Sequence, residues 1–110
     1  MQDNSHEDFN PIVVVAIRLI KALATFPLGN VAITAHAMSE LFPFDVLTAL
    51  ERHSQRDWGN VHPEDRGLND AALLEGYRLV SVYDDMGPVT FWIITEADRS
   101  LTTILLPDDY

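Results

Sequence analysis

Residues 91–107 read FWIITEADRSLTTILLP and hold two strand-like apolar runs on either side of a short charged segment, EADRS. Both runs are rich in β-branched and aromatic residues, which is typical of strands, and the charged segment is short enough to form a hairpin turn. Two interpretations of this turn are open. It is a polar cap in which Asp98 and Arg99 hold the turn geometry, or it is a reactive site supported by a sheet.

The segments before this hairpin predict one more strand and a helix. Residues 77–83 alternate in polarity with period two, which is typical of a strand, and a DDMG turn connects them to the hairpin. A helix is expected directly upstream, because Pro63 suits a first helical turn, acidic residues follow it and Gly76 ends the pattern. Its expected apolar stripe consists of Leu68, Ala71, Ala72 and Leu74.

The first half of the chain predicts helices and one short strand. Thr34 is typical of an N-cap for a helix over residues 35–41, residues 45–55 show a second helical pattern, and residues 31–33 suit an edge strand. For residues 12–24 the apolar spacing favours an amphipathic helix, whereas the VVV triplet favours a strand. The order of elements predicts an α+β fold, with N-terminal helices followed by a three- to four-stranded antiparallel meander sheet.

The domain organisation follows from composition and length. We expect residues 1–25 to form an acidic tail plus an added amphipathic helix, and residues 26–110 to form a single α+β domain. The chain contains no cysteine, which suits a reducing cytoplasm. The apolar run at residues 12–24 is too short and too charged to span a bilayer. We therefore expect a cytoplasmic protein with no membrane partner.

The charge balance disfavours nucleic acid as a ligand. The chain has 7 Lys and Arg residues against 17 Asp and Glu residues, for a net charge of −10. A field of this sign repels phosphate backbones. The acidity therefore serves solubility, or it offers an acidic surface to a protein partner with a basic surface.

Metal binding and catalysis each require particular residue types at particular spacings in this chain. We expect neither a metal nor a cofactor, because metal-ligand spacing is lacking among the histidines, which are His6, His36, His53 and His62. If the protein is an enzyme, its base, acid and cation suit a metal-independent ribonuclease. Its catalytic residues would then be His53, Glu96, Arg99 and Thr102.

The segment RHSQRDWG at residues 52–59 is the candidate binding surface. Arg52 and Arg56 lie four residues apart at an expected helix end and form the natural pair for a phosphate or a carboxylate. Trp58 is either a core residue under the loop or a stacking platform. Together with the neighbouring strand and the hairpin turn, the candidate binding residues are Arg52, Arg56, Asp57, Trp58, Tyr83, Asp98 and Arg99.

Three motifs occur together in the last three quarters of the chain: FPLGNVAIT at residues 26–34, RHSQRDWG at 52–59 and WIITEADRS-x-TTILLP at 92–107. In these motifs the chain resembles a family of short proteins carried on plasmids and integrative elements of proteobacteria, often labelled plasmid-related protein or type I restriction endonuclease subunit M. His36-Ala37 departs from the Pro-Gly pair of that family, and no D/N-P-P-Y/F methyltransferase motif is present. The resemblance implies a mobile-element setting, in which small proteins are commonly accessory factors, toxins or inhibitors of host defence.

Three functional hypotheses follow. The first is a non-enzymatic accessory protein that acts by protein binding, most concretely as an inhibitor of a host defence complex of restriction or CRISPR type that binds nucleic acid. The second is a ribonuclease or toxin-like enzyme of the barnase-EndoU-colicin-RelE type, to which the order of helices before a meander is similar. The third is a homodimer formed through the edge strand or the apolar residues 12–23, and it is compatible with either of the others.

Overall fold

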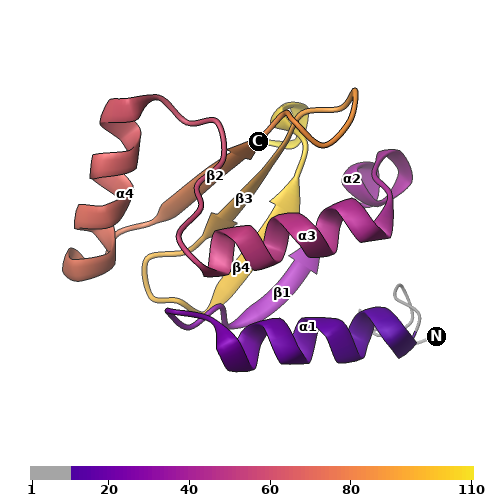
Figure 1. Ribbon diagram of the computed structural model, residues 1–110, viewed down its shortest axis with the longest axis horizontal. Helices are drawn as coiled ribbons and strands as arrows, with labels where there is room; N and C mark the ends of the chain where they lie inside the picture. Colours follow the sequence, from indigo (N-terminus) through magenta and orange to yellow (C-terminus); the bar gives the residue numbers. More distant parts are fainter. Residues whose placement is uncertain (1–10) are drawn as a thin grey trace.

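The computed structural model describes residues 11–110 of the chain (Figure 1). The expected acidic tail and His6 lie outside the described residues. The α+β prediction is confirmed. Within residues 11–110, no helix has the length and apolar character needed to cross a membrane. The helices are α1 (Pro11–Leu23), α2 (Ala35–Glu40), α3 (Pro43–Ser54), α4 (Pro63–Glu75) and the final 3-10 helix η2 (Pro107–Asp109).

The sheet has four strands in the order β1-β4-β3-β2. The predicted meander is present, because β2 (Leu79–Tyr83), β3 (Phe91–Thr95) and β4 (Leu101–Leu105) pair antiparallel in sequence order. The edge strand β1 (Asn30–Ile33), however, pairs parallel to β4. The expectation of a purely antiparallel sheet was therefore wrong, and the sheet is mixed. The polarity pattern of a short strand places it at an edge but does not determine the direction of a partner far along the chain.

The segment for which helix and strand were both open forms helix α1. Its inward stripe follows a helical spacing of three and four residues: Val13 is buried, and Ile17 and Ile20 pack against the core. In Figure 1, α1 runs alongside α3, and the two helices are in contact. Helix packing thus overrides the strand preference of the VVV triplet.

The remaining helices pack around the sheet. Helix α3 contacts β3, α4 contacts β2 and α2 contacts β4. The predicted cap of α2 is present, because Thr34 Oγ1 accepts a hydrogen bond of 3.0 Å from the backbone N–H of Ala37. The predicted end of α4 is also present, because Gly76 adopts a left-handed conformation with φ of 78°.

The inward face of α4 differs from the predicted apolar stripe. Leu68 and Leu74 are 66% and 91% exposed, whereas Asn69 is buried together with Ala72. The Asn69 side chain donates to the carbonyl of Val80 at 2.8 Å and accepts from its N–H at 3.1 Å. An edge strand has backbone N–H and C=O groups that no neighbouring strand pairs. The Asn69 amide bonds both of these groups of Val80, whereas a leucine side chain has no hydrogen-bonding atom.

The loop after α3 completes the cover of the same edge. Gly59 forms a parallel bridge with Val82, whose N–H donates to the Trp58 carbonyl at 3.1 Å and whose carbonyl accepts from Asn60 N–H at 2.7 Å. Gly59 has φ of 73°, and a Cβ at this position would lie 2.0 Å from the carbonyl oxygen of Val82. Only glycine fits this approach without strain.

Candidate functional site

A chain of buried polar side chains runs from α3 across three strands. His53 has no exposed surface; its Nδ1 lies 2.6 Å from Ser81 Oγ on β2, and its Nε2 lies 2.9 Å from Thr95 Oγ1 on β3. Thr95 Oγ1 is 2.8 Å from Thr102 Oγ1 on β4. The Thr102 hydroxyl donates to the carbonyl of Leu28 at 2.7 Å. We call these four side chains, His53, Ser81, Thr95 and Thr102, the buried histidine network.

The last acceptor fixes the direction of every bond in the buried histidine network. A carbonyl oxygen can only accept, so the Thr102 hydroxyl donates its proton to the Leu28 carbonyl. Thr102 therefore accepts from Thr95, which is the donor in the bond between the two threonines. His53 Nε2–H therefore donates to Thr95, and Nδ1 accepts from Ser81. Burial, with a smaller contribution from the charge of Arg99, lowers the pKa of His53 to about 3. The imidazole is thus neutral and satisfied on both nitrogens.

Aromatic rings enclose the same histidine. Phe26 and Trp58 each meet the His53 ring edge-on, with centroids 5.5 Å away. Trp58 is 4% exposed, and its indole N–H donates to Asp70 Oδ1 at 3.1 Å. Trp58 therefore lies in the core under the loop, where it cannot stack on a ligand from solvent.

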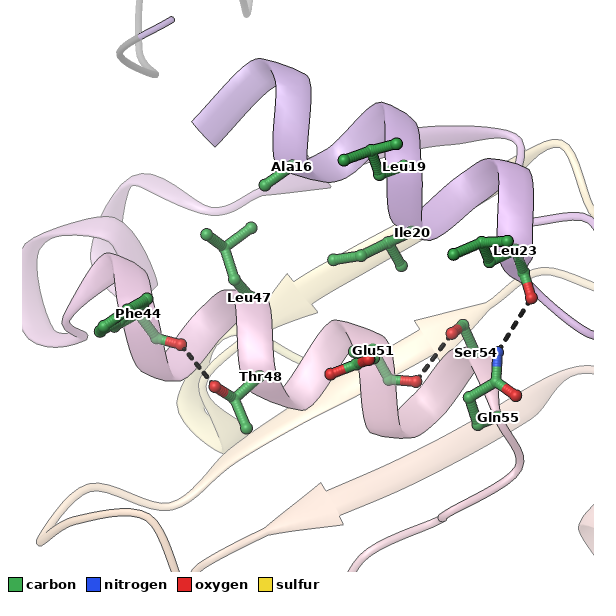
Figure 2. Close-up of a pocket in the computed structure, with 10 residues that line it drawn as sticks. All are labelled: Ala16, Leu19, Ile20, Leu23, Phe44, Leu47, Thr48, Glu51, Ser54 and Gln55. Atoms are coloured by element: carbon green, nitrogen blue, oxygen red, sulfur yellow. Dashed lines mark hydrogen bonds between the residues drawn. The ribbon is translucent and has the colours of Figure 1, made fainter. Parts of the chain in front are cut away.

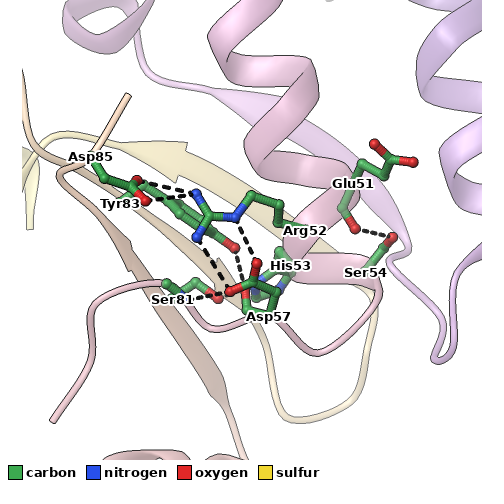
Figure 3. A network of polar contacts seen from close by, with 9 residues as sticks. Glu51, Arg52, His53, Ser54, Asp57, Ser81, Tyr83 and Asp85 are labelled. Atoms are coloured by element: carbon green, nitrogen blue, oxygen red, sulfur yellow. Dashed lines mark hydrogen bonds and ion pairs between the residues drawn. The ribbon is translucent and has the colours of Figure 1, made fainter. Parts of the chain in front are cut away.

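A second polar cluster lies where α3 ends (Figure 3). Arg52 donates to Asp57 Oδ2 at 2.7 Å through Nε and to Asp85 Oδ1 at 3.1 Å through Nη1. Its guanidinium lies over the ring of Tyr83, 4.8 Å from the centroid, and the Tyr83 hydroxyl donates to the Asp57 carbonyl at 2.7 Å. The hydrogen bonds from Arg52 hold the pKa of Asp57 below its usual value, and burial raises the pKa of Tyr83. Arg52 is thus committed to holding the loop.

Arg56 does not continue the helix that carries Arg52. Helix α3 ends at Ser54, and Arg56 follows in a left-handed conformation with φ of 67°. The spacing of four residues therefore does not place the two side chains on one helix face. Arg56 is exposed on the loop.

Arg99 is also engaged by the protein itself. Its Nη1 donates to the carbonyls of Tyr77 at 2.7 Å and Glu96 at 3.0 Å, and its Nη2 donates to the carbonyl of Ala72 at 3.1 Å. This places a cation at the carboxyl end of α4, where the helix dipole favours it. Arg99 therefore fixes the hairpin turn to α4.

The other charged residues of the hairpin hold the turn or neighbouring chain. Asp98 Oδ1 accepts from the N–H of Ser100 at 3.0 Å and from its hydroxyl at 2.6 Å, and this lowers the pKa of Asp98. Glu96 Oε1 lies 3.5 Å from Arg78 Nη2, and Arg78 Nη1 donates to the hydroxyl of Tyr110. The contacts agree with the polar-cap interpretation of EADRS.

The structure brings together only part of the predicted catalytic set. His53 and Thr102 meet through Thr95, whereas Glu96 and Arg99 lie at the hairpin turn with their own partners. Arg52 lies at one end of β2 and Arg99 at the other. Because β2 has five residues, its two ends are roughly 15 Å apart. In the part of the chain that the structure describes, no group of three or more potential metal ligands is close enough to hold an ion.

Sequence reasoning assigned no buried hydrogen-bond partner to Ser81, Thr95 or Asn69. A signal for the two hydroxyls existed, because both occupy inward positions of strands whose other inward residues are apolar. A hydroxyl at such a position needs a buried partner, and His53 provides it. Comparison with known proteins finds no matching family model, no matching curated protein and no matching solved structure.

Proposed function

We propose that this chain is a non-enzymatic accessory protein of a mobile element that binds a protein partner with a basic surface. The most concrete form of the proposal is an inhibitor of a host defence complex, whose nucleic-acid-binding surface is necessarily basic. The observation that carries it is the distribution of charge over the folded chain. The resemblance to plasmid-borne proteins supports the mobile-element setting.

The charge is strongly segregated along the chain. Residues 40–110 contain 14 acidic and five basic residues, whereas residues 11–39 contain no acidic residue. Three of those five basic side chains are bonded internally, Arg52 to carboxylates, Arg78 to Tyr110 and Glu96, and Arg99 to backbone carbonyls. That leaves two basic residues, Arg56 and Arg66, against 14 acidic residues in this part, and this excess of negative charge supports a protein partner rather than nucleic acid.

Six of these 14 carboxylates lie on or beside the loop of residues 55–62. Several are tied to the loop or the helix end before it: Asp84 accepts from Asn60 at 2.8 Å, Asp85 from Arg52 and Asp70 from Trp58. Such bonds fix the carboxylates in place before any partner arrives, and preorganised charges cost less to bind. We call the exposed residues of this surface the acidic patch; they are Asp57, Glu64, Asp65, Asp70, Asp84 and Asp85.

The experiment is an affinity capture from host lysate with a matched pair of variants. The patch variant combines Glu64→Gln, Asp65→Asn and Asp84→Asn. A control variant removes the same charge from exposed positions outside the patch, through the substitutions Glu40→Gln, Glu75→Gln and Asp108→Asn. We expect the wild type and the control to retain a stoichiometric basic complex after nuclease treatment, and the patch variant to lose it.

Two outcomes contradict the proposal. Equal capture by both variants would show that the acidic patch does not make the contact. Tight binding of the purified protein to DNA or RNA at physiological salt would show that the charge argument fails. The ribonuclease hypothesis stays a prediction with its own test: RNA cleavage that is unchanged by His53→Ala would remove the assignment of His53.

A further inference from the structure

Helix α1 has an apolar stripe that faces away from the core. Its residues are spaced by three, four and four positions, which places them on one line along a helix. Each is between 55% and 78% exposed, whereas the inward stripe of the same helix packs against the core. A surface helix of a monomer normally has one apolar stripe and a polar outer face. We call the outward stripe the α1 ridge; it consists of Ile12, Val15, Leu19 and Leu23.

Beside the α1 ridge lies an apolar groove between α1 and α3. The groove has a volume of about 760 Å³, and Figure 2 shows the side chains of both helices that line it. Leu19 and Leu23 belong to both the ridge and the groove. Phe44 of α3, which is 80% exposed, extends the apolar lining. At the other end, Gln55 Nε2 donates to the Leu23 carbonyl at 2.9 Å and holds the two helix ends together.

The charges along this face are complementary to each other. On α1, Arg18 is exposed and precedes Leu19 of the α1 ridge, and α1 contains no acidic residue. Across the groove, α3 presents Glu51, which is exposed and lines the groove. A face of this kind has apolar, cationic and anionic elements that match a copy of itself.

We propose that a second copy of this chain covers this face, with the α1 ridge of each copy lying in the α1/α3 groove of the other. Ridge and groove lie on the same face of one chain, so a single two-fold axis brings both pairs together at once. The helix-in-groove contact would use the leucines of the ridge as anchors. The same axis places Arg18 of one copy near Glu51 of the other.

The first test is the oligomeric state of the purified protein by sedimentation equilibrium, with two leucine variants. Leu19→Glu puts a charge at the centre of the proposed contact and should weaken dimerisation at least ~100-fold. Leu74→Glu is the matched control, because Leu74 is 91% exposed on α4, away from the groove. It should leave the dimer unchanged. Circular dichroism checks that both variants are folded, and Val15→Glu serves as a second ridge variant.

The second test is a charge exchange across the axis. Arg18→Glu and Glu51→Arg should each weaken the dimer, because each creates a pair of like charges, and the double variant should restore it. A monomeric wild type overturns the proposal, and so does a dimer that survives both Leu19→Glu and Val15→Glu. A double variant no tighter than the single variants would likewise exclude the two-fold arrangement described. None of these outcomes depends on the acidic patch or its partner.

Discussion

Acidification should destabilise this protein through His53, and the structure gives the size of the effect. The imidazole is buried and neutral, with a pKa of about 3 in the folded state against 6.5 for a free side chain. Below pH 6.5, His53 binds a proton in the unfolded chain but stays neutral in the folded chain. The contribution of His53 is therefore constant above pH 6.5 and is lost progressively as the pH falls towards 3.

The loss follows from the linkage relation. One proton bound only by the unfolded state lowers the free energy of unfolding by ~1.4 kcal/mol per pH unit. Between pH 7 and pH 4.5 this amounts to about 2.5 kcal/mol, because the first half unit lies above the pKa of the free side chain. A domain with a typical stability of ~5–15 kcal/mol would lose a substantial part of it.

The assay compares the wild type with His53→Gln by urea unfolding at several pH values between 7 and 4.5, followed by tryptophan fluorescence. Glutamine does not titrate, so its pH profile lacks the single proton of His53. At pH 7 the variant should be less stable by ~1–3 kcal/mol, because a hydrogen bond of the buried network is lost. As the pH falls, the difference between the two proteins should shrink or reverse.

Carboxylates that titrate in acid affect the stability of the wild type and of His53→Gln equally. The pKa values of Asp57 and Asp109 are lowered in the folded state, by the hydrogen bonds from Arg52 and Thr34 respectively. Their contributions are present above the unfolded pKa and are also lost in acid, but both proteins contain them, so they cancel in the difference. Parallel pH profiles for the wild type and His53→Gln would refute the argument for a buried neutral histidine.

Three further predictions concern stability and are measured by urea unfolding at pH 7. Asn69→Ala removes both hydrogen bonds to the Val80 backbone and should cost about 1–3 kcal/mol, whereas an unchanged midpoint would contradict the role given to this amide. Gly59→Ala should cost at least ~2 kcal/mol, because it combines a positive φ with a clash, while Gly67→Ala in the open part of α4 should stabilise by about 0.5–1 kcal/mol. Arg99→Ala should cost ~1–2 kcal/mol and increase amide exchange in the last turn of α4; unchanged exchange there would exclude the link between hairpin and helix.

The sequence by itself determined those features that depend on neighbours along the chain. The hairpin around EADRS follows from two β-rich runs and a turn, and the end of α4 follows from a glycine that accepts a left-handed conformation. The Thr34 cap likewise involves a backbone group three residues away. Periodicities of two and of three to four residues, and caps, are local interactions, so a linear pattern encodes them.

Only the tertiary structure decided which groups meet across long separations. Three features join residues that are distant in sequence. They are the parallel pairing of β1 with β4, the burial of Asn69 against β2, and the hydrogen bonds of the His53 ring. The sequence pattern around a histidine on a helix is the same whether its side chain faces solvent or packs against the sheet. Its burial, its pKa and the partners of its nitrogens depend on what the rest of the chain packs against it.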